Sequence, residues 1–203
     1  MGIMSEQFIM RCWYAAAWDE DVVAGQMHAI TICGIPLLIY RAEDGEIVVL
    51  EDRCCHRLAP LSKGRIEDGC NIRCMYHGLK FDRDGKCIEI PGQDIIPETA
   101  VVRRFAARAH YGWIWVWLAD DAPADDALLP VTEHFTNEGL RWRRGNIDYE
   151  TDYELINDNL TDFSHLSFVH AESFRATEIW SRKRPDVKLI DRGIRVTRWY
   201  GPG

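Results

Sequence analysis

The chain of 203 residues is 47% hydrophobic and 28% charged, and it carries a formal net charge of −8 at pH 7. This composition is that of a folded chain with enough apolar material for one large or two small domains. Phosphate binding needs a clustered basic surface, so the acidic balance and the lack of a lysine and arginine block argue against nucleic acid as a partner.

The opening segment, MGIMSEQFIMRCWYAAAW, has no basic leader followed by an uninterrupted apolar run. We therefore expect neither a secretory signal nor a spanning helix, no membrane partner, and a cytoplasmic location. Seven cysteines, with Cys54 and Cys55 adjacent, favour metal ligation in a reducing compartment over a disulfide framework. The cysteines without assigned chemistry are predicted to be small buried residues: Cys12, Cys33, Cys70 and Cys87.

From about residue 13 to residue 118, short apolar runs alternate with turn dipeptides. The runs ITICGIPLLIYR and EIVVLED flank Asp44-Gly45, and two further Asp-Gly pairs follow at 68–69 and 84–85. Strand-sized runs separated by Asp-Gly turns are typical of antiparallel sheets. In YGWIWVWL, at 111–118, tryptophans alternate with Ile114 and Val116, which predicts a strand buried on at least one face. We expect a mainly β unit of small antiparallel sheets.

Between residues 119 and 145 the sequence becomes acidic and rich in turn residues, which predicts a connection between domains. Beyond it, YELINDNLTDFSHLSFVH spaces its apolar residues at helical offsets without glycine or proline, and predicts a helix. The stretch DVKLIDRGIRVTRWYG predicts a hairpin that turns at 191–193. The predicted division is a β domain over 1–120, a connection over 121–146, and the beginning of an α+β domain over 147–203.

Cysteine and histidine occur as two mixed pairs. Cys54-x-His56 is followed, after 17 residues, by Cys74-x-x-His77. A Rieske [2Fe-2S] centre binds one iron through two thiolates and the other through two imidazoles, so each of two loops gives one cysteine and one histidine. Turn residues beside both pairs favour such loops. A structural zinc site accepts the same four residues and stays open as an alternative.

Longer stretches around these pairs resemble the signature of Rieske oxygenase α-subunits: Cys54-x-His56-Arg57, Ala59-Pro60-Leu61-Ser62 and Cys74-x-Tyr76-His77-Gly78. The segments RCWYAAAW, EIPGQ and YGWIWVW are similar to the vanillate and dicamba O-demethylase branch. This branch usually has proline where the chain has Cys55 and Met75, which implies altered loops with the cluster retained. The resemblance implies a Rieske domain followed by the start of a helix-grip catalytic domain.

A second constellation lies in the predicted helix. Asn159, Asp162 and His165 recur every three residues and share a helix face, but five residues of ideal helix turn His170 about 140° away from His165. Both imidazoles reach one metal only if the helix is interrupted, for which we expect residues 167–169 to be the place. Without context such residues are more often surface or capping groups. Beside an electron relay, two histidines and a carboxylate are the usual set for non-haem ferrous iron.

The resemblance implies that His165 and His170 bind ferrous iron. It also implies that Asp162 connects this iron to His77 on a neighbouring subunit of a trimer, and that Asn159 lies near the iron. In the family, the third iron ligand is a carboxylate much further along the chain. The available carboxylates do not match that position: Glu172, Glu178, Asp186 and Asp191. We expect the N-terminal portion of a longer oxygenase, or a truncated product with an intact cluster and a defective iron site.

The expected function is that of the terminal oxygenase component of a multicomponent system, which uses O2 to hydroxylate or O-demethylate a small aromatic substrate. No G-x-G-x-x-G fingerprint follows any predicted strand, so electrons must come from a separate NAD(P)H-dependent reductase, with or without a ferredoxin. Two alternatives remain. A Rieske ferredoxin-like electron carrier would not need His165 and His170, and a zinc-stabilised binding module would hold no cluster.

Overall fold

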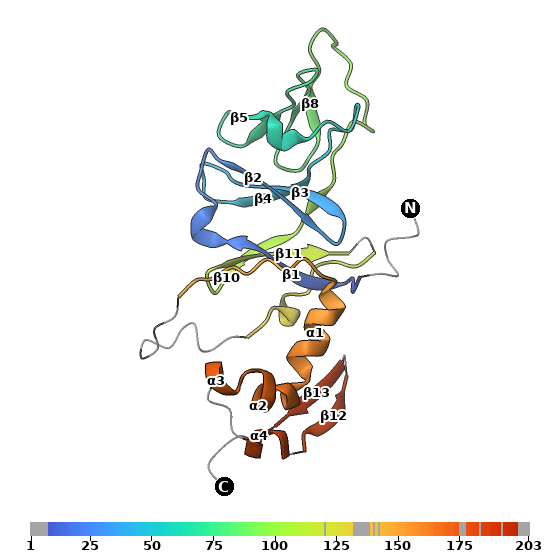
Figure 1. The fold of residues 1–203 in the computed structure, drawn as a ribbon. Helices are drawn as coiled ribbons and strands as arrows, with labels where there is room; N and C mark the ends of the chain where they lie inside the picture. Colours follow the sequence, from blue (N-terminus) through green and yellow to red (C-terminus); the bar gives the residue numbers. More distant parts are fainter. Residues whose placement is uncertain are drawn as a thin grey trace. The chain divides into compact units, whose positions relative to one another are not determined.

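The computed structural model describes residues 8–119, 121–131, 139, 141, 143–174, 178–182, 184–191 and 193–198. The chain forms two compact units, Met1–Trp142 and Arg143–Gly203. The first is built of β-sheets, and the second combines short helices with a β-hairpin (Figure 1). The predicted fold class, mainly β followed by α+β, is confirmed. No described helix has both the length and the apolar character needed to cross a membrane.

Two antiparallel sheets of the first unit lie one above the other (Figure 1). One has the order β2-β3-β4-β9, with β2 Met27–Ile32, β3 Ile35–Arg41, β4 Ile47–Glu51 and β9 Arg104–Phe105. The other has the order β1-β11-β10, with β1 Cys12–Trp18, β11 Trp113–Leu118 and β10 Ala107–His110. Ile114 and Val116 of β11 are fully buried against Leu37, Ile39 and Val49 of the facing sheet. The predicted alternation along 111–118 is thereby confirmed.

A third, smaller sheet has the order β5-β6-β7-β8. Its strands are β5 Arg65–Glu67, β6 Asn71–Arg73, β7 Lys80–Phe81 and β8 Cys87–Glu89. Ile72 and Phe81 are fully buried and share a core with Leu61 of the 3-10 helix η2, Leu61–Lys63. Two further 3-10 turns, η1 Asp19–Asp21 and η3 Asp126–Leu128, complete this unit.

The four cysteines that were predicted to be buried differ in their exposure. Cys87 is 1% exposed, whereas Cys12, Cys33 and Cys70 are half-buried, so the prediction is wrong for these three. Cys33 and Cys70 occupy turns, and Cys12 begins an edge strand, so one side of each backbone faces away from the core. No disulfide bond joins any of the seven cysteines, all of which lie in the described residues.

The Asp-Gly turns predicted from the sequence connect strands, but they differ in their surroundings. Gly45 has φ +89° and an added Cβ would meet nothing within 4 Å, whereas Gly85 has φ +80° and its Cβ would lie 2.0 Å from the Val102 carbonyl oxygen. The left-handed conformation alone makes Gly45→Ala cost about 1 kcal/mol. For Gly85→Ala we expect about 3 kcal/mol or more, because the backbone must also move. Urea unfolding of both variants checks this, and equal losses would contradict it.

The second unit begins with α1, Tyr153–Thr161, which Asp152 caps by accepting from the Glu154 amide at 2.9 Å. Four short segments follow: η5 Phe163–His165, α2 Leu166–Val169, α3 Ala171–Phe174 and α4 Glu178–Arg182. The predicted interruption between the two histidines is present, because α2 ends at Val169 and His170 leaves the helical conformation, but the long helix α1 already ends earlier, at Thr161. Asp162 causes the break, since its side chain accepts from the Ser164 amide and starts a new segment.

Strands β12, Asp186–Ile190, and β13, Gly193–Thr197, form the predicted hairpin. Gly193 begins β13, and Arg192 of the predicted turn lies outside the described residues. Two cross-strand pairs, Val187 with Val196 and Leu189 with Ile194, place apolar side chains on one face. The alternation expected of an amphipathic strand is thus present in both strands.

Candidate metal centres

The first ligand loop, which carries Cys54 and His56, connects β4 to η2. The Cys54 amide donates to the Ala59 carbonyl at 2.8 Å, and the Leu58 amide donates to the Cys54 carbonyl at 2.9 Å. Leu58 has φ +57°, which is unusual for a residue with a side chain. The loop therefore folds back on the cysteine and turns His56 outward.

The second ligand loop joins β6 to β7 and repeats this pattern. The Cys74 amide donates to the Leu79 carbonyl at 2.8 Å, and the Gly78 amide donates to the Cys74 carbonyl at 3.2 Å. Gly78 has φ +73° at the place that Leu58 holds in the first loop. Two separate segments thus adopt the same backbone geometry around a cysteine. This is the arrangement expected of two loops that bind one group from opposite sides.

The four predicted cluster residues differ in exposure according to residue type. Cys54 and Cys74 are each 2% exposed, whereas His56 and His77 lie at the surface with ring centroids 4.5 Å apart and an interplanar angle of 65°. Burial raises the pKa of the Cys54 thiol to about 12. A thiolate at this position therefore needs a cation beside it, which iron supplies.

This arrangement fits a two-iron cluster better than a zinc ion. Among the described residues, no three histidines, cysteines, aspartates or glutamates converge to hold one ion. Each iron of a Rieske cluster takes two protein ligands and two bridging sulfides, so a thiol pair and an imidazole pair suffice. A structural zinc needs four donors around one point.

The imidazole pair borders an open cavity of about 510 Å³. The segment after β8 forms the opposite wall with Pro91, Gln93 and Thr99. Tyr76, which is 59% exposed, packs its ring 4.0 Å from that of His77. The histidine edges are therefore accessible from outside the first unit, while the thiols are not.

The second constellation surrounds the break after α1. His165 and His170 are half-buried, and their ring centroids lie 5.4 Å apart. Nδ1 of His165 contacts the Asp162 carbonyl oxygen, which can only accept, so Nδ1 carries the proton and the Nε2 lone pair stays available. The Ser164 amide donates to the Asp162 side chain at 2.9 Å and lowers the pKa of that carboxyl group. Asn159 is exposed on α1, and no hydrogen bond among the described residues joins its side chain to the histidines.

No third iron ligand joins the two imidazoles in the described part of the chain. The carboxylates considered from the sequence are all exposed: Glu172, Glu178, Asp186 and Asp191. The second constellation is thus a pair of histidines with an adjacent carboxylate that serves as a helix cap.

Sequence reasoning missed two groups beside the cluster loops. Asp52 is buried and bonded to Ser62, and Arg73 donates to the Gly78 carbonyl oxygen at 2.8 Å. The sequence offered one signal, a charged residue one or two positions before each ligand cysteine, but it did not show what these side chains contact.

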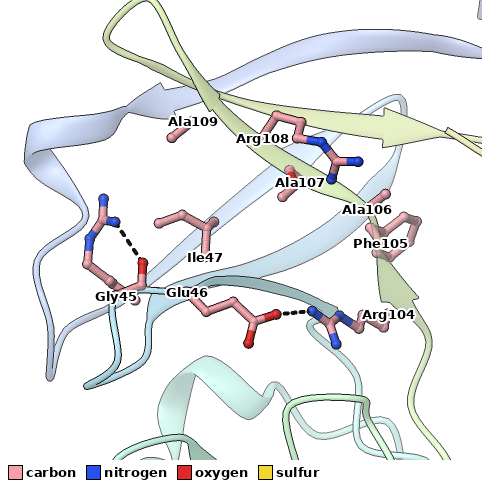
Figure 2. A pocket seen from close by; sticks show the side chains of 10 residues that line it. Gly45, Glu46, Ile47, Arg104, Phe105, Ala106, Ala107, Arg108 and Ala109 are labelled. Carbon is pink, nitrogen blue, oxygen red and sulfur yellow. Dashed lines mark hydrogen bonds and ion pairs between the residues drawn. The ribbon is translucent and has the colours of Figure 1, made fainter. Parts of the chain in front are cut away.

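Another cavity, of about 620 Å³, lies where β9 leaves the sheet of β4 and continues into β10. Figure 2 shows Arg104 bonded to Glu46 at its edge, with Ile47 and Phe105 in the wall. Its other arginines are also paired, Arg41 with Asp19 and Arg108 with Asp126. No residue of either constellation lines it, so its role is separate from the metal centres.

Two protein-family models match the chain. They are the Rieske [2Fe-2S] domain, over residues 12–100, and the vanillate O-demethylase oxygenase C-terminal domain, over residues 149–202. The chain belongs to the Rieske oxygenase family. The predicted resemblance is therefore confirmed, and the loops described above lie in the segment that matches the Rieske domain.

Individual relatives agree with this membership. The chain is 40% identical over 200 residues to the iron-sulfur subunit of the toluene-4-sulfonate monooxygenase system of Comamonas testosteroni, covering 95% of this chain and 56% of that protein. It is 34% identical over 190 residues to the oxygenase component of dicamba O-demethylase from Stenotrophomonas maltophilia, covering 93% of this chain and 55% of that protein. The crystal structure of dicamba monooxygenase bound to dicamba superposes with a TM-score of 0.77 at 33% identity, over 92% of this chain and 55% of that chain. The Rieske chain described here thus spans about half the length of these relatives.

Proposed function

We propose that this Rieske chain acts as the terminal oxygenase component of a multicomponent system. The observation that carries the proposal is the pair of equivalent loops, which bury two thiols and present two imidazoles at the surface. The pair His165 and His170 in the second unit supports a second iron, and one of the similar solved structures is that of dicamba monooxygenase with non-haem iron and dicamba.

The residue roles follow from chemistry and burial. Cys54 and Cys74 bind one iron of the cluster, and His56 and His77 bind the other. His165 and His170 hold the mononuclear iron through Nε2 of His165 and an imidazole nitrogen of His170. When bound, the cluster passes single electrons and the ferrous iron activates O2. The protein keeps the thiol side of the cluster dry and leaves the imidazole edges accessible for electron exchange.

Asp162 is proposed to couple the two centres. Its carbonyl oxygen fixes the tautomer of His165, and its carboxylate, held by the Ser164 amide, has a further lone pair for the exposed imidazole of His77. We propose that this contact forms between neighbouring subunits of a trimer, as the resemblance implies. Asn159 is proposed to lie near the iron. The proposed domains are 1–120 and 147–203, joined by 121–146.

The substrate is proposed to be a small aromatic compound that is hydroxylated or O-demethylated. The names of the relatives support this class, since they include toluene-4-sulfonate and dicamba. Electrons would come from an NAD(P)H-dependent reductase, with or without a ferredoxin.

A second candidate function is electron transfer without oxygenation. The observation that favours it is that no third ligand converges with His165 and His170 on one metal position among the described residues. Such a protein would load the cluster and pass electrons to a partner, and it would hold little mononuclear iron.

Metal analysis of anaerobically purified protein distinguishes these functions. For the oxygenase we expect about three irons per two acid-labile sulfides, together with a Rieske-type electron paramagnetic resonance (EPR) signal after dithionite reduction. About two irons per two sulfides would support the electron carrier. Zinc without sulfide would contradict both functions.

A further inference from the structure

Asp52 is the one charged residue that is buried in the described parts of the chain, at 7% exposure. Its two carboxylate oxygens accept from the amide of Ser62 at 2.7 Å and from the hydroxyl of Ser62 at 2.6 Å. Its own amide donates to the Pro36 carbonyl oxygen at 2.9 Å. Among the described residues, the hydrogen bonds to this carboxylate come from Ser62 and not from a lysine or arginine, and the adjacent Arg53 pairs with Glu51 instead. A buried carboxylate without a cation is costly, so its presence requires an explanation.

The position of Asp52 connects it to the first ligand loop. It directly follows β4, two residues before Cys54, and Ser62 lies in η2 just after the loop. The two hydrogen bonds between Asp52 and Ser62 therefore close the loop that carries Cys54 and His56. Leu61, beside Ser62, is fully buried and anchors the far end of the loop in the core.

The second ligand loop is closed by Arg73, whose positive charge is balanced by neighbouring carboxylates. Arg73 precedes Cys74, is 12% exposed at its side chain, and donates to the Gly78 carbonyl oxygen at 2.8 Å. Its guanidinium also pairs with Glu67 at 2.8 Å and with Glu89 at 2.7 Å. The positive charge beside the second loop is thus balanced, whereas the negative charge beside the first is not.

An uncompensated buried charge acts on a redox centre nearby. Reduction adds one negative charge to the cluster, and the low dielectric of the interior screens its repulsion by Asp52 only partly. The reduced form is therefore disfavoured relative to a loop without this charge. Net charge and hydrogen bonding around a cluster are established determinants of its potential.

We propose that Asp52 is a positioning residue that closes the first ligand loop through Ser62 and lowers the reduction potential of the cluster through its unpaired buried charge. This proposal rests on the cluster assigned under the proposed function. It makes the carboxylate a determinant of how readily the chain accepts an electron from its donor.

The test is a redox titration of the cluster in the full chain, followed by the EPR signal of the reduced form. Asp52→Asn keeps an oxygen that can accept from the Ser62 amide and removes the charge, so the potential should shift upward. The matched control is Asp44→Asn, since Asp44 is exposed and accepts from the Glu46 amide at 3.1 Å through the same oxygen type. This control should leave the potential unchanged, because Asp44 is paired with Arg83 and solvent screens its charge. An unshifted potential in Asp52→Asn, or equal shifts in both variants, would overturn the proposal.

A second variant keeps the proposal testable if Asp52→Asn loads no cluster. Ser62→Ala retains the charge and removes one of its hydrogen-bond donors, so the potential should stay unchanged or fall. A rise in Ser62→Ala would overturn the proposal. If the unaltered chain contains no iron and sulfide, the cluster assignment itself is refuted. This result differs from a cluster that is present but whose potential does not change in Asp52→Asn.

Discussion

Cys74→Ser is expected to remove the cluster entirely, with loss of the acid-labile sulfide, the visible colour and the EPR signal of the reduced protein. Cys74 is 2% exposed and its thiol interacts with that of Cys54, so water has little access to take its place at the iron. A serine hydroxyl is a far weaker ligand than a thiolate, since it does not ionise near neutral pH.

The matched control is Cys87→Ser. Cys87 is 1% exposed and belongs to the same hydrophobic core as both ligand cysteines, so it undergoes the same change of sulfur to oxygen at a similar depth. This variant should keep two irons and two sulfides per cluster, with a modest loss of stability. Retention of the cluster in Cys74→Ser, or its loss in Cys87→Ser alone, would contradict the ligand assignment.

Asp162→Asn is expected to leave the fold and both metals in place and to slow product formation about 10- to 100-fold. The asparagine side-chain oxygen can still accept from the Ser164 amide, and the backbone carbonyl oxygen still contacts His165. What is lost is the negative charge and one acceptor for the proposed contact with His77. The expected defect therefore lies in electron transfer between the centres.

Single turnovers of the chemically reduced protein measure this defect directly, through the rate at which O2 and an aromatic substrate reoxidise the cluster. Asp158→Asn is the control, because Asp158 is exposed on α1 one turn earlier and loses the same charge. We expect wild-type rates in the control and both metals bound in both variants. Normal product formation by Asp162→Asn with both sites loaded would refute the coupling role.

The sequence predicted much of the fold because the relevant signals are local. Asp-Gly dipeptides specify tight turns, and alternation in YGWIWVWL specifies which side of β11 is buried, whatever lies elsewhere in the chain. The spacing from Cys54 to His56 and from Cys74 to His77 likewise reflects what two loops must supply to one cluster. Residue chemistry and short spacings were enough for these features.

Helix boundaries followed less directly from the sequence. Apolar periodicity continues through 163–169, so the pattern predicted one helix interrupted near its end. That interruption is present at the end of α2, and a further break occurs earlier, because Asp162 forms a side-chain cap that periodicity does not reveal. The rings of His165 and His170 lie 5.4 Å apart across the end of α2, where His170 leaves the helical conformation.

By itself, the sequence determined the types of ligand, their pairing along the chain and the class of cofactor. Only the tertiary structure decided that both loops share one backbone geometry, that the thiols are buried while the imidazoles are accessible, and that Asp52 bonds Ser62 ten residues away. The physical reason is that hydrogen bonds and burial depend on where the chain path brings separate segments together. Residue spacing within one segment does not show which distant segments it contacts in the folded chain.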